Sequence, residues 1–399
     1  MKPPNILWIT IDAARKDRFS CYGYEKKTTP FIDQLSEKSI VFENAYTVAP
    51  WTLPSVASMF TGLYPSEHGA VNEQTKLKKK TSTIAEDLKK KGYETLMITQ
   101  NDGWINPLFR LTKGFDTVFD IDEMIQSFLG VSVRSVGKYV FGYDVLTRLV
   151  FEKQLKKRKE PWFSYIHLMD THLPYEPKTD LFSSFFRYLV FYKDWKRKIW
   201  NSWIGKKSFS FKETRMLNEL YDKALLGADA QIKKLCSLVA NLENTVVIIT
   251  SDHGENLGEY GLFDHQFSEH DTLIKIPLII YAPFIDKKKI SSLFENKDLF
   301  FLIQKLVDGD FSSFSRDYVF GENSEPLSLY NKLNKKKKNL SKKSKYIVTS
   351  KIKYIEYDNG KNELRNNDKK IKNQMVSKQF QLLCRNKQNQ LRKVNSIYP

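Results

Sequence analysis

Four side chains in this sequence have the types and spacing needed to bind a divalent cation and to activate a hydroxyl group. Asp12 comes directly after an apolar run, and the pair Asp252–His253 follows another one. Thr52 stands at the start of a short apolar stretch that reads as a helix. Carboxylate and imidazole groups bind divalent cations, and a bound cation would lower the pKa of a nearby threonine hydroxyl. The set therefore predicts a metal-activated nucleophile.

Each of these residues also has a structural explanation when it is read alone. An aspartate after a strand commonly caps a helix or forms a turn, which applies to Asp12. Thr52 is a suitable N-cap, because Pro54 would occupy the first turn of the helix that follows. His253 is harder to explain in this way, because a turn uses an aspartate and a glycine but has no need for an imidazole. Both interpretations of Thr52 remain open, and a helix beginning there would favour a bound phosphate or sulfate through its N–H groups and dipole.

The elements that position these residues read as alternating strands and helices. Uniformly apolar runs are typical of buried parallel strands, and here they cover residues 5–11, 94–100, 245–250 and 276–282. Between them lie stretches with apolar residues at helical spacing, at residues 31–38, 82–92 and 215–242. The pattern predicts an α/β fold, a three-layer α/β/α sandwich with a mostly parallel sheet. Because ligands bind beyond the carboxyl ends of such strands, Asp12 and Asp252 are expected to meet at one edge.

The chain of 399 residues is expected to divide into two parts. Residues 1–310 would form the catalytic domain, with an insert at about 178–212, and residues 311–399 a basic C-terminal subdomain or tail. Short alternating runs, at residues 345–350 and 351–358, predict an antiparallel hairpin in a small α+β subdomain.

Most of the net charge of +18 lies near the C-terminus, where residues 331–399 hold 20 Lys and Arg against 4 Asp and Glu. A solvated loop is one explanation for such a run, and attraction to an anionic polymer or lipid is the other. The interleaved aromatic and glycine residues of RNA-binding modules are missing, so nucleic acid is not an expected partner.

Membrane insertion and export are not indicated by the sequence. The first apolar run breaks at Asp12 after seven residues, too short for a signal peptide, and no later run reaches the length of a transmembrane helix. The three cysteines, Cys21, Cys236 and Cys384, show no metal-type spacing and suit a reducing interior. A cytoplasmic protein is therefore expected. The aromatic and basic stretch 181–211 suggests either a lid over the active site or an amphipathic element that contacts a membrane peripherally.

Several motifs occurring in order resemble the sulfatase family, within the alkaline phosphatase superfamily. They span residues 5–69 and 246–283, with "YIHLMDTHLPYEP" and "YDKALLGADAQIKKL" between them. The resemblance implies a metal site and substrate contacts at specific positions. The implied metal ligands are Asp12, Asp252 and His253 together with Thr52 at the position of the nucleophile, and the implied substrate contacts are His172 and His265.

The sequence departs from the family pattern next to the nucleophile. Thr52 replaces the Cys or Ser that sulfatases oxidise to formylglycine, and Val56 stands where they have arginine. Ala13 replaces the second of two adjacent aspartates, which favours Mn²⁺ or Zn²⁺, with Ca²⁺ or Mg²⁺ as alternatives. A threonine nucleophile resembles instead the phosphodiesterases, phosphonate hydrolases and phosphoethanolamine or phosphoglycol transferases of the superfamily.

The expected function is therefore metal-dependent hydrolysis of a sulfuric or, more naturally, phosphoric ester of a glycan, lipid or small molecule, through a covalent Thr52 intermediate. The alternative is a phosphoethanolamine- or phosphoglycol-type transferase acting on a cell-envelope glycan or lipid. A third hypothesis, an inactive binding protein, is disfavoured because a decayed site has no reason to retain all four residues. Asp170 could be a second metal ligand or part of a polar turn, and His167 is interpreted as a core histidine satisfied by the backbone.

Overall fold

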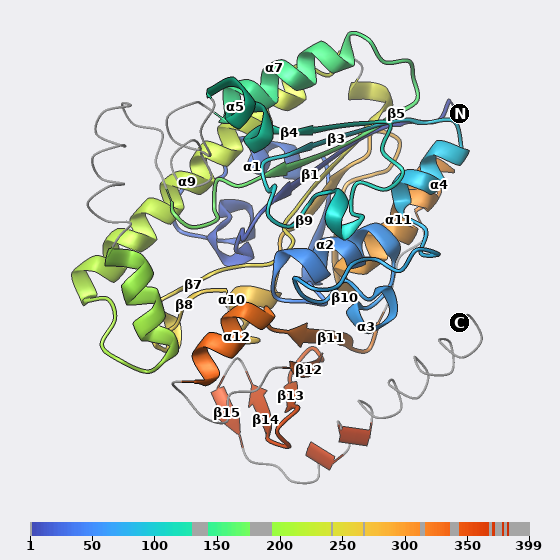
Figure 1. Ribbon diagram of the computed structural model, residues 1–399. Helices are drawn as coiled ribbons and strands as arrows, with labels where there is room; N and C mark the ends of the chain where they lie inside the picture. Colours follow the sequence, from blue (N-terminus) through green and yellow to red (C-terminus); the bar gives the residue numbers. More distant parts are fainter. Residues whose placement is uncertain are drawn as a thin grey trace.

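The computed structural model (Figure 1) describes the greater part of the chain. The described residues are 2–129, 143–175, 194–240, 242–265, 268–311, 316–335, 343–366, 369–371, 377–378 and 381–382.

A sheet of eight strands forms the centre of the molecule. Its strands are β1 (Asn5–Ile11), β2 (Ile40–Tyr46), β3 (Glu94–Thr99), β4 (Thr117–Asp120), β5 (Trp162–Leu168), β6 (Thr245–Thr250), β9 (Leu278–Tyr281) and β10 (Lys288–Glu295). Their order is β10-β2-β9-β6-β1-β5-β3-β4. β1 pairs in parallel with both β5 and β6. The two runs that precede Asp12 and Asp252 are therefore parallel, as predicted, and the structure shows that they are also neighbours.

One strand of the sheet runs against the expected direction. The run 276–282 forms β9, which pairs antiparallel with β2 and with β6. The prediction of a parallel strand there was wrong, because uniform apolar character reports burial on both faces and carries no information about direction. The sheet is therefore mixed, although most of its pairings are parallel.

Helices cover both faces of this sheet and complete the three layers. They are α1 (Pro30–Ser36), α2 (Thr52–Thr61), α3 (Pro65–His68), α4 (Ile84–Lys90), α5 (Ile121–Leu129), α7 (Tyr143–Leu155), α9 (Phe211–Ser237), α10 (Asp271–Ile274) and α11 (Leu299–Val307). Successive residues of β1 point to opposite faces. Ile6 and Trp8 pack with α2, α4 and α11, whereas Leu7 and Ile9 pack with α1, α7 and α9.

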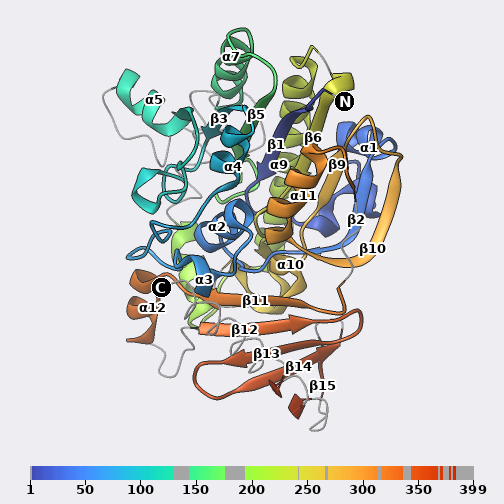
Figure 2. The same cartoon turned by 90° about the vertical axis from the view of Figure 1, so that its right-hand side faces the viewer.

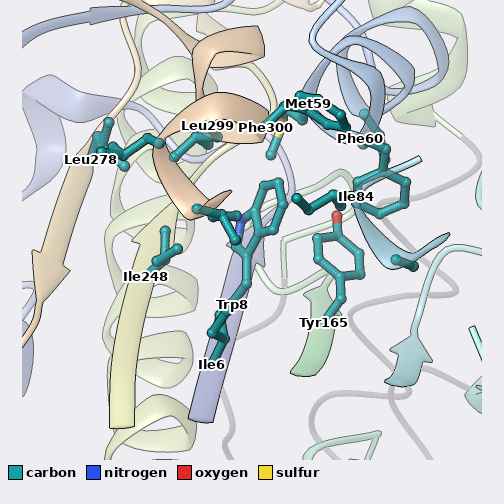
Figure 3. Close-up of a cluster of buried hydrophobic side chains, with 14 of the residues drawn as sticks. Ile6, Trp8, Met59, Phe60, Ile84, Tyr165, Ile248, Leu278, Leu299 and Phe300 are labelled. Atoms are coloured by element: carbon teal, nitrogen blue, oxygen red, sulfur yellow. The ribbon is translucent and has the colours of Figure 1, made fainter. Parts of the chain in front are cut away.

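The core beneath α2 is built on aromatic rings (Figure 3). Trp8 on β1 lies edge-to-face with Phe60 on α2 and with Tyr165 on β5, at centroid distances of 5.8 and 5.4 Å. All three side chains are fully buried. These contacts tie the helix that begins at Thr52 to the two central strands.

A second, smaller sheet lies at the end of the molecule (Figure 2). Its strands are all antiparallel, in the order β11 (Val319–Ser324), β12 (Lys343–Val348), β13 (Lys353–Tyr357), β14 (Asn362–Asn366) and β15 (Lys369–Ile371). The hairpin predicted from residues 345–358 is present as β12 and β13, and α12 (Leu327–Asn334) completes the α+β subdomain. Its apolar face packs against the end of β2 and the segment around α10.

Candidate active site

Asp12 follows β1 and lies fully buried at the carboxyl edge of the central sheet. Its Oδ2 accepts hydrogen bonds from Asn101 Nδ2 at 2.8 Å and from His167 Nε2 at 2.9 Å. Its backbone oxygen accepts a hydrogen bond from the Thr171 hydroxyl. Its Oδ1 accepts no hydrogen bond from a described residue. One oxygen is thus held by neighbours, and the other is left to bind a ligand.

Asp252 and His253 follow β6 and meet Asp12 at the same edge. Asp252 Oδ1 accepts hydrogen bonds from the backbone N–H groups of His253 and Ala13, at 2.9 and 3.2 Å, while its Oδ2 accepts none from a described residue. His253 Nδ1 lies 2.8 Å from the Gly254 carbonyl oxygen. A carbonyl can only accept, so Nδ1 is the protonated nitrogen and Nε2 keeps a lone pair.

Thr52 completes this group from the other side. It is the first residue of α2, it is 2% exposed, and its Oγ1 lies 3.3 Å from His253 Nε2 and 3.5 Å from Asp12 Oδ2. The N-cap position of α2 is occupied by Trp51, one residue before Thr52. The capping interpretation of Thr52 is therefore wrong, because its hydroxyl lies against the acidic and imidazole groups.

A divalent cation fits the donors that meet here. The ligand atoms of Asp12, Asp252 and His253 lie within 4.8 Å of one another, and all three residues are buried. The oxygens that lack hydrogen bonds, Asp12 Oδ1 and Asp252 Oδ2, belong to this set. Buried carboxylate oxygens without partners are costly unless they bind a cation. A metal-binding centre is thus supported by the donor atoms themselves.

The pKa shifts of the residues in this centre also support a bound cation. Burial raises the pKa of Asp12, but the charge of His172 and the hydrogen bond and charge of His167 outweigh it and hold that pKa well below its usual range. Burial, together with the nearby charge of Asp12, raises the pKa of Asp252 to about 7. Burial lowers the pKa of His253 to about 3, so the imidazole is neutral. A bound cation would relieve the repulsion between the two carboxylates.

A second layer of polar residues holds α2 against the loop after β6. Ser55 Oγ, one turn after Thr52, donates to the Asp252 carbonyl at 2.7 Å. Asn296 Nδ2 donates to Ser55 Oγ at 2.8 Å, and Asn296 Oδ1 accepts from the Val48 N–H at 3.0 Å. These residues are fully buried. The nucleophile position and the metal-binding loop are therefore linked through one serine.

The two implied substrate contacts lie beside this centre. The ring of His265 is 4.6 Å from that of His253 and 5.2 Å from that of His172, measured between centroids. His172 Nδ1 donates to the Leu173 carbonyl at 2.8 Å. Asp170 lies in the turn after β5 and belongs to neither group of candidate metal ligands found among the described residues.

Sequence reasoning missed or misread two neighbours of Asp12. Asn101 follows β3 and could have been found by the same rule that found Asp12 and Asp252. His167 was interpreted as satisfied by the backbone, and this was wrong: its partners are the Asp12 carboxylate and the Tyr165 hydroxyl, 2.8 Å from Nδ1. Its position inside a buried strand gave no sign of this contact.

Some predicted features lie wholly or partly outside the described residues. Of the aromatic insert, only residues from 194 onward are described, where residues 194–203 are helical. Cys384 also lies outside them, while Cys21 and Cys236 carry free thiols. Among the described helices, none combines the length and apolar character that crossing a bilayer would require.

The family model described as Sulfatase matches residues 4–308. The chain belongs to the sulfatase family. Membership places it in the alkaline phosphatase superfamily and makes it a hydrolase of ester bonds. The family uses a divalent metal, and the buried cluster of Asp12, Asp252 and His253 fits such a site. The expected fold class and enzyme class are thereby confirmed.

Relatives of this sulfatase-family chain differ in the ester they are named for. It is 24% identical over 343 residues to the uncharacterized sulfatase YidJ of Escherichia coli, covering 77% of this chain and 68% of that protein. It is 23% identical over 294 residues to the phosphoethanolamine transferase EptA of Helicobacter pylori, covering 71% of this chain and 49% of EptA. The match thus spans only about half of that transferase.

Solved structures share the fold across nearly the whole chain. The phosphonate monoester hydrolase of Agrobacterium radiobacter superposes with a TM-score of 0.74 at 16% identity, covering 98% of this chain and 95% of that one. A 2-O GAG sulfatase superposes with the same TM-score at 17% identity, covering 98% and 92%. At these identities the likeness concerns the fold.

Proposed function

We propose that this chain hydrolyses phosphoric esters with Thr52 as the nucleophile. The observation that carries the proposal is the position of Thr52 Oγ1, 3.3 Å from His253 Nε2 and 3.5 Å from Asp12 Oδ2. A hydroxyl that neither caps its helix nor faces solvent, and lies against a metal-binding set, is placed to attack a bound ester.

The residues divide the reaction between them. Asp12, Asp252 and His253 would hold the cation, which when bound would lower the pKa of the Thr52 hydroxyl and polarise the ester oxygen. Thr52 Oγ1 forms a bond to phosphorus while the bond to the leaving oxygen breaks. His172 and His265 lie beside the centre and would contact the substrate. In the second step water attacks the phosphorus of the phosphothreonine, the Thr52 Oγ1–P bond breaks, and the phosphate product leaves with Thr52 restored.

The proposal favours phosphoric over sulfuric esters because Thr52 replaces the Cys or Ser from which sulfatases form their nucleophile. Threonine has a secondary alcohol and cannot be converted to formylglycine, so the aldehyde hydrate that attacks sulfate is absent from this chain. Threonine can instead attack phosphorus directly. Mixed imidazole and carboxylate donors suit Mn²⁺ or Zn²⁺ better than Ca²⁺.

A substrate panel with three variants tests the proposal. Purified enzyme is assayed with aryl sulfate, phosphate monoester, phosphate diester and phosphonate in the presence of Mn²⁺ or Zn²⁺. We expect the wild type to turn over a phosphoester. Thr52→Ala should lower this turnover by about 10³-fold or more, and Asp252→Asn and His253→Ala should abolish it. Thr52→Ser keeps a hydroxyl and should retain activity. Full activity in Thr52→Ala, or turnover of sulfate esters alone, would contradict the proposal.

Transfer of the phosphoryl-linked group to an acceptor alcohol is the second candidate function, supported by the match to EptA. Transfer shares the first half-reaction with hydrolysis. The two differ in whether an acceptor alcohol or water attacks the phosphorus of the phosphothreonine. Product analysis with a lipid or glycan acceptor separates the two: a substituted acceptor indicates transfer, and free product alone indicates hydrolysis.

We also propose peripheral contact with an anionic lipid surface through the basic tip around Phe211. This side chain is 88% exposed at the start of α9, and Lys206, Lys207 and Lys212, which are also exposed, lie near it in the sequence. Aromatic and basic side chains together suit a lipid interface. A cytoplasmic location remains a prediction from the sequence.

Cosedimentation with phosphatidylglycerol vesicles at low salt tests the lipid contact. The wild type should bind the vesicles. The variant that combines Phe211→Ser with Lys206→Glu, Lys207→Glu and Lys212→Glu should not bind them. Leu108→Ser removes another highly exposed apolar side chain, 78% exposed, and serves as the control. Absence of wild-type binding would refute the contact.

A further inference from the structure

Ala13, the residue after Asp12, has a backbone conformation that alanine rarely adopts. Its φ angle is 58°, in the left-handed region, where the Cβ of an L-residue crowds the backbone. The residue is fully buried. A strained conformation of this kind persists only where the surrounding structure holds it, and such conformations gather at functional sites. The hydrogen bonds of Ala13 must therefore offset this strain.

The N–H of Ala13 connects the loop after β1 to the second carboxylate of the candidate metal centre. It donates to Asp252 Oδ1 at 3.2 Å, and the same oxygen accepts from the His253 N–H at 2.9 Å. The other oxygen, Asp252 Oδ2, lies 3.4 Å from His253 Nε2, among the donors that could share a cation. A rotation of Ala13 out of the left-handed region would redirect its N–H and remove one of the two bonds that orient Asp252.

The hydroxyl of Tyr221, on α9, holds the same loop through two backbone groups. It donates to the Ala13 carbonyl at 2.7 Å and accepts from the Arg15 N–H at 2.7 Å. Burial raises the pKa of Tyr221 well above its usual range, so the hydroxyl keeps the proton that it donates. The ring is fully buried and lies edge-to-face with Tyr175, at a centroid distance of 5.2 Å. The hydroxyl is thus fixed by packing.

Arg15, the second partner of this hydroxyl, is anchored through its side chain. Its Nη1 donates to the Glu255 carbonyl at 3.2 Å and pairs with Glu259 Oε1 at 2.7 Å. These acceptors lie at the hairpin formed by β7 (Asn256–Leu257) and β8 (Phe263–Asp264). The segment from Ala13 to Arg15 is therefore attached at both ends, and the Tyr221 hydroxyl bridges it.

We propose that Tyr221 is a positioning residue for the metal centre: its hydroxyl keeps Ala13 in the left-handed conformation and thereby orients the Asp252 carboxylate. Groups that orient a ligating carboxylate tune its affinity for metal. The inference rests on the metal-binding part of the proposed function and is independent of the nucleophile. It gives a role to the first residue of the motif "YDKALLGADAQIKKL", which the proposed chemistry does not use.

Titration of the metal-free, full-length protein with Mn²⁺ tests the role of the hydroxyl. Tyr221→Phe keeps the ring and should weaken Mn²⁺ binding by about 10- to 100-fold. Adding Ala13→Gly to Tyr221→Phe should restore most of the affinity, because glycine adopts a positive φ without a steric penalty. The rescue is specific to a role that acts through the conformation of Ala13.

Tyr93→Phe is the matched control, because it removes a tyrosine hydroxyl that bonds to the backbone at the other end of β1. The Tyr93 hydroxyl donates to the Pro4 carbonyl at 2.8 Å, and Tyr93 is buried. This variant should bind Mn²⁺ as the wild type does. Amide hydrogen exchange of the metal-free proteins gives a second readout: exchange at the Ala13 N–H should be faster in Tyr221→Phe and unchanged in Tyr93→Phe.

Several outcomes would overturn the proposal. They are wild-type Mn²⁺ affinity in Tyr221→Phe, a double variant that binds as weakly as Tyr221→Phe, and unchanged exchange at Ala13 in Tyr221→Phe. A wild type that binds no Mn²⁺ would overturn it together with the metal site. Weakened Mn²⁺ binding in Tyr221→Phe combined with full activity in Thr52→Ala would support the role of Tyr221 and refute only the nucleophile.

Discussion

The two oxygens of Asp12 have different surroundings, and this difference decides what the residue can do. Asn101 and His167 both donate to Oδ2, at 2.8 and 2.9 Å, whereas Oδ1 has no such partner among the described residues. Groups that donate to a ligating carboxylate fix its orientation and tune its affinity for metal. We therefore propose that Asn101 and His167 position Asp12 for binding a cation.

Asn101→Ala should weaken metal binding by about 10- to 100-fold, as is usual for the loss of a group that orients a ligand. The variant removes the donor to Asp12 Oδ2 and leaves all three proposed ligands in place. Titration of the metal-free protein with Mn²⁺ measures the effect. Asn106→Ala alters an amide of the same loop that bonds only to its own turn, and should bind Mn²⁺ as the wild type does. Equal affinities in the two variants would contradict the assigned role.

The sequence was sufficient to predict that Asp12, Asp252 and His253 meet at one sheet edge, because all three follow strands, and that Thr52 begins a helix. Their catalytic and metal-binding roles remain predictions. The sequence could not predict the contact of His167 with Asp12. That contact depends on the register in which Thr10 of β1 pairs with His167 of β5, and a strand sequence does not encode its register with a distant partner.

At the scale of elements, the start of α2 is held by a segment far away in the sequence. Asn296 lies in a short 3₁₀ turn after β10, and its amide bonds to Ser55, Thr47 and the Val48 N–H. Ser55 in turn donates to the carbonyl of Asp252. Buried hydrogen bonds of this kind set the distance between Thr52 and the loop that carries Asp252 and His253.

Asn296→Ala should therefore reduce both stability and turnover. Leaving buried donors and acceptors without partners costs about 1–3 kcal/mol, and the freed helix start should lower kcat more than it raises KM. Urea unfolding followed by steady-state kinetics measures the two effects. A variant with reduced stability but unchanged kcat would show that Asn296 supports the fold without positioning Thr52.

Strand direction is the element-scale feature that could not be predicted. The run 276–282 was correctly recognised as a buried strand. Its antiparallel pairing with β6 depends on the edge of the sheet at which the connection between the two strands ends. That connection contains the hairpin β7–β8 and α10, whose short elements carry no strong periodic signal.

At the scale of the whole molecule, the C-terminal sheet supports the catalytic edge directly. The Tyr346 hydroxyl donates to the Thr47 carbonyl at 2.7 Å, and the Glu322 N–H donates to the Val48 carbonyl at 2.8 Å. Both carbonyls belong to the segment that leads into α2. The placement of a domain boundary near residue 310 remains a prediction, since the two sheets share buried apolar residues.

Gly321→Ala should disrupt this support. A Cβ at Gly321 would lie 2.0 Å from Cζ of Tyr346, so the ring would have to move and its hydroxyl would leave Thr47. Overpacking of this kind costs about 1–3 kcal/mol, and the midpoint of thermal unfolding should fall together with activity. Tyr346→Phe removes only the hydroxyl and should have a smaller effect. An unchanged midpoint in Gly321→Ala would argue against the coupling.

The indole of Trp51, next to Thr52, donates to the carbonyl of Ser324 at 3.0 Å, across 273 positions of sequence. During synthesis at about 5–20 residues per second, the helix that begins at Thr52 waits on the order of 10–60 s for this partner to be made. A nascent chain that has released the whole central sheet still lacks the strand that supports α2. We therefore expect catalytic competence to arise only after the last strands leave the ribosome, so that truncated products of interrupted translation remain inactive.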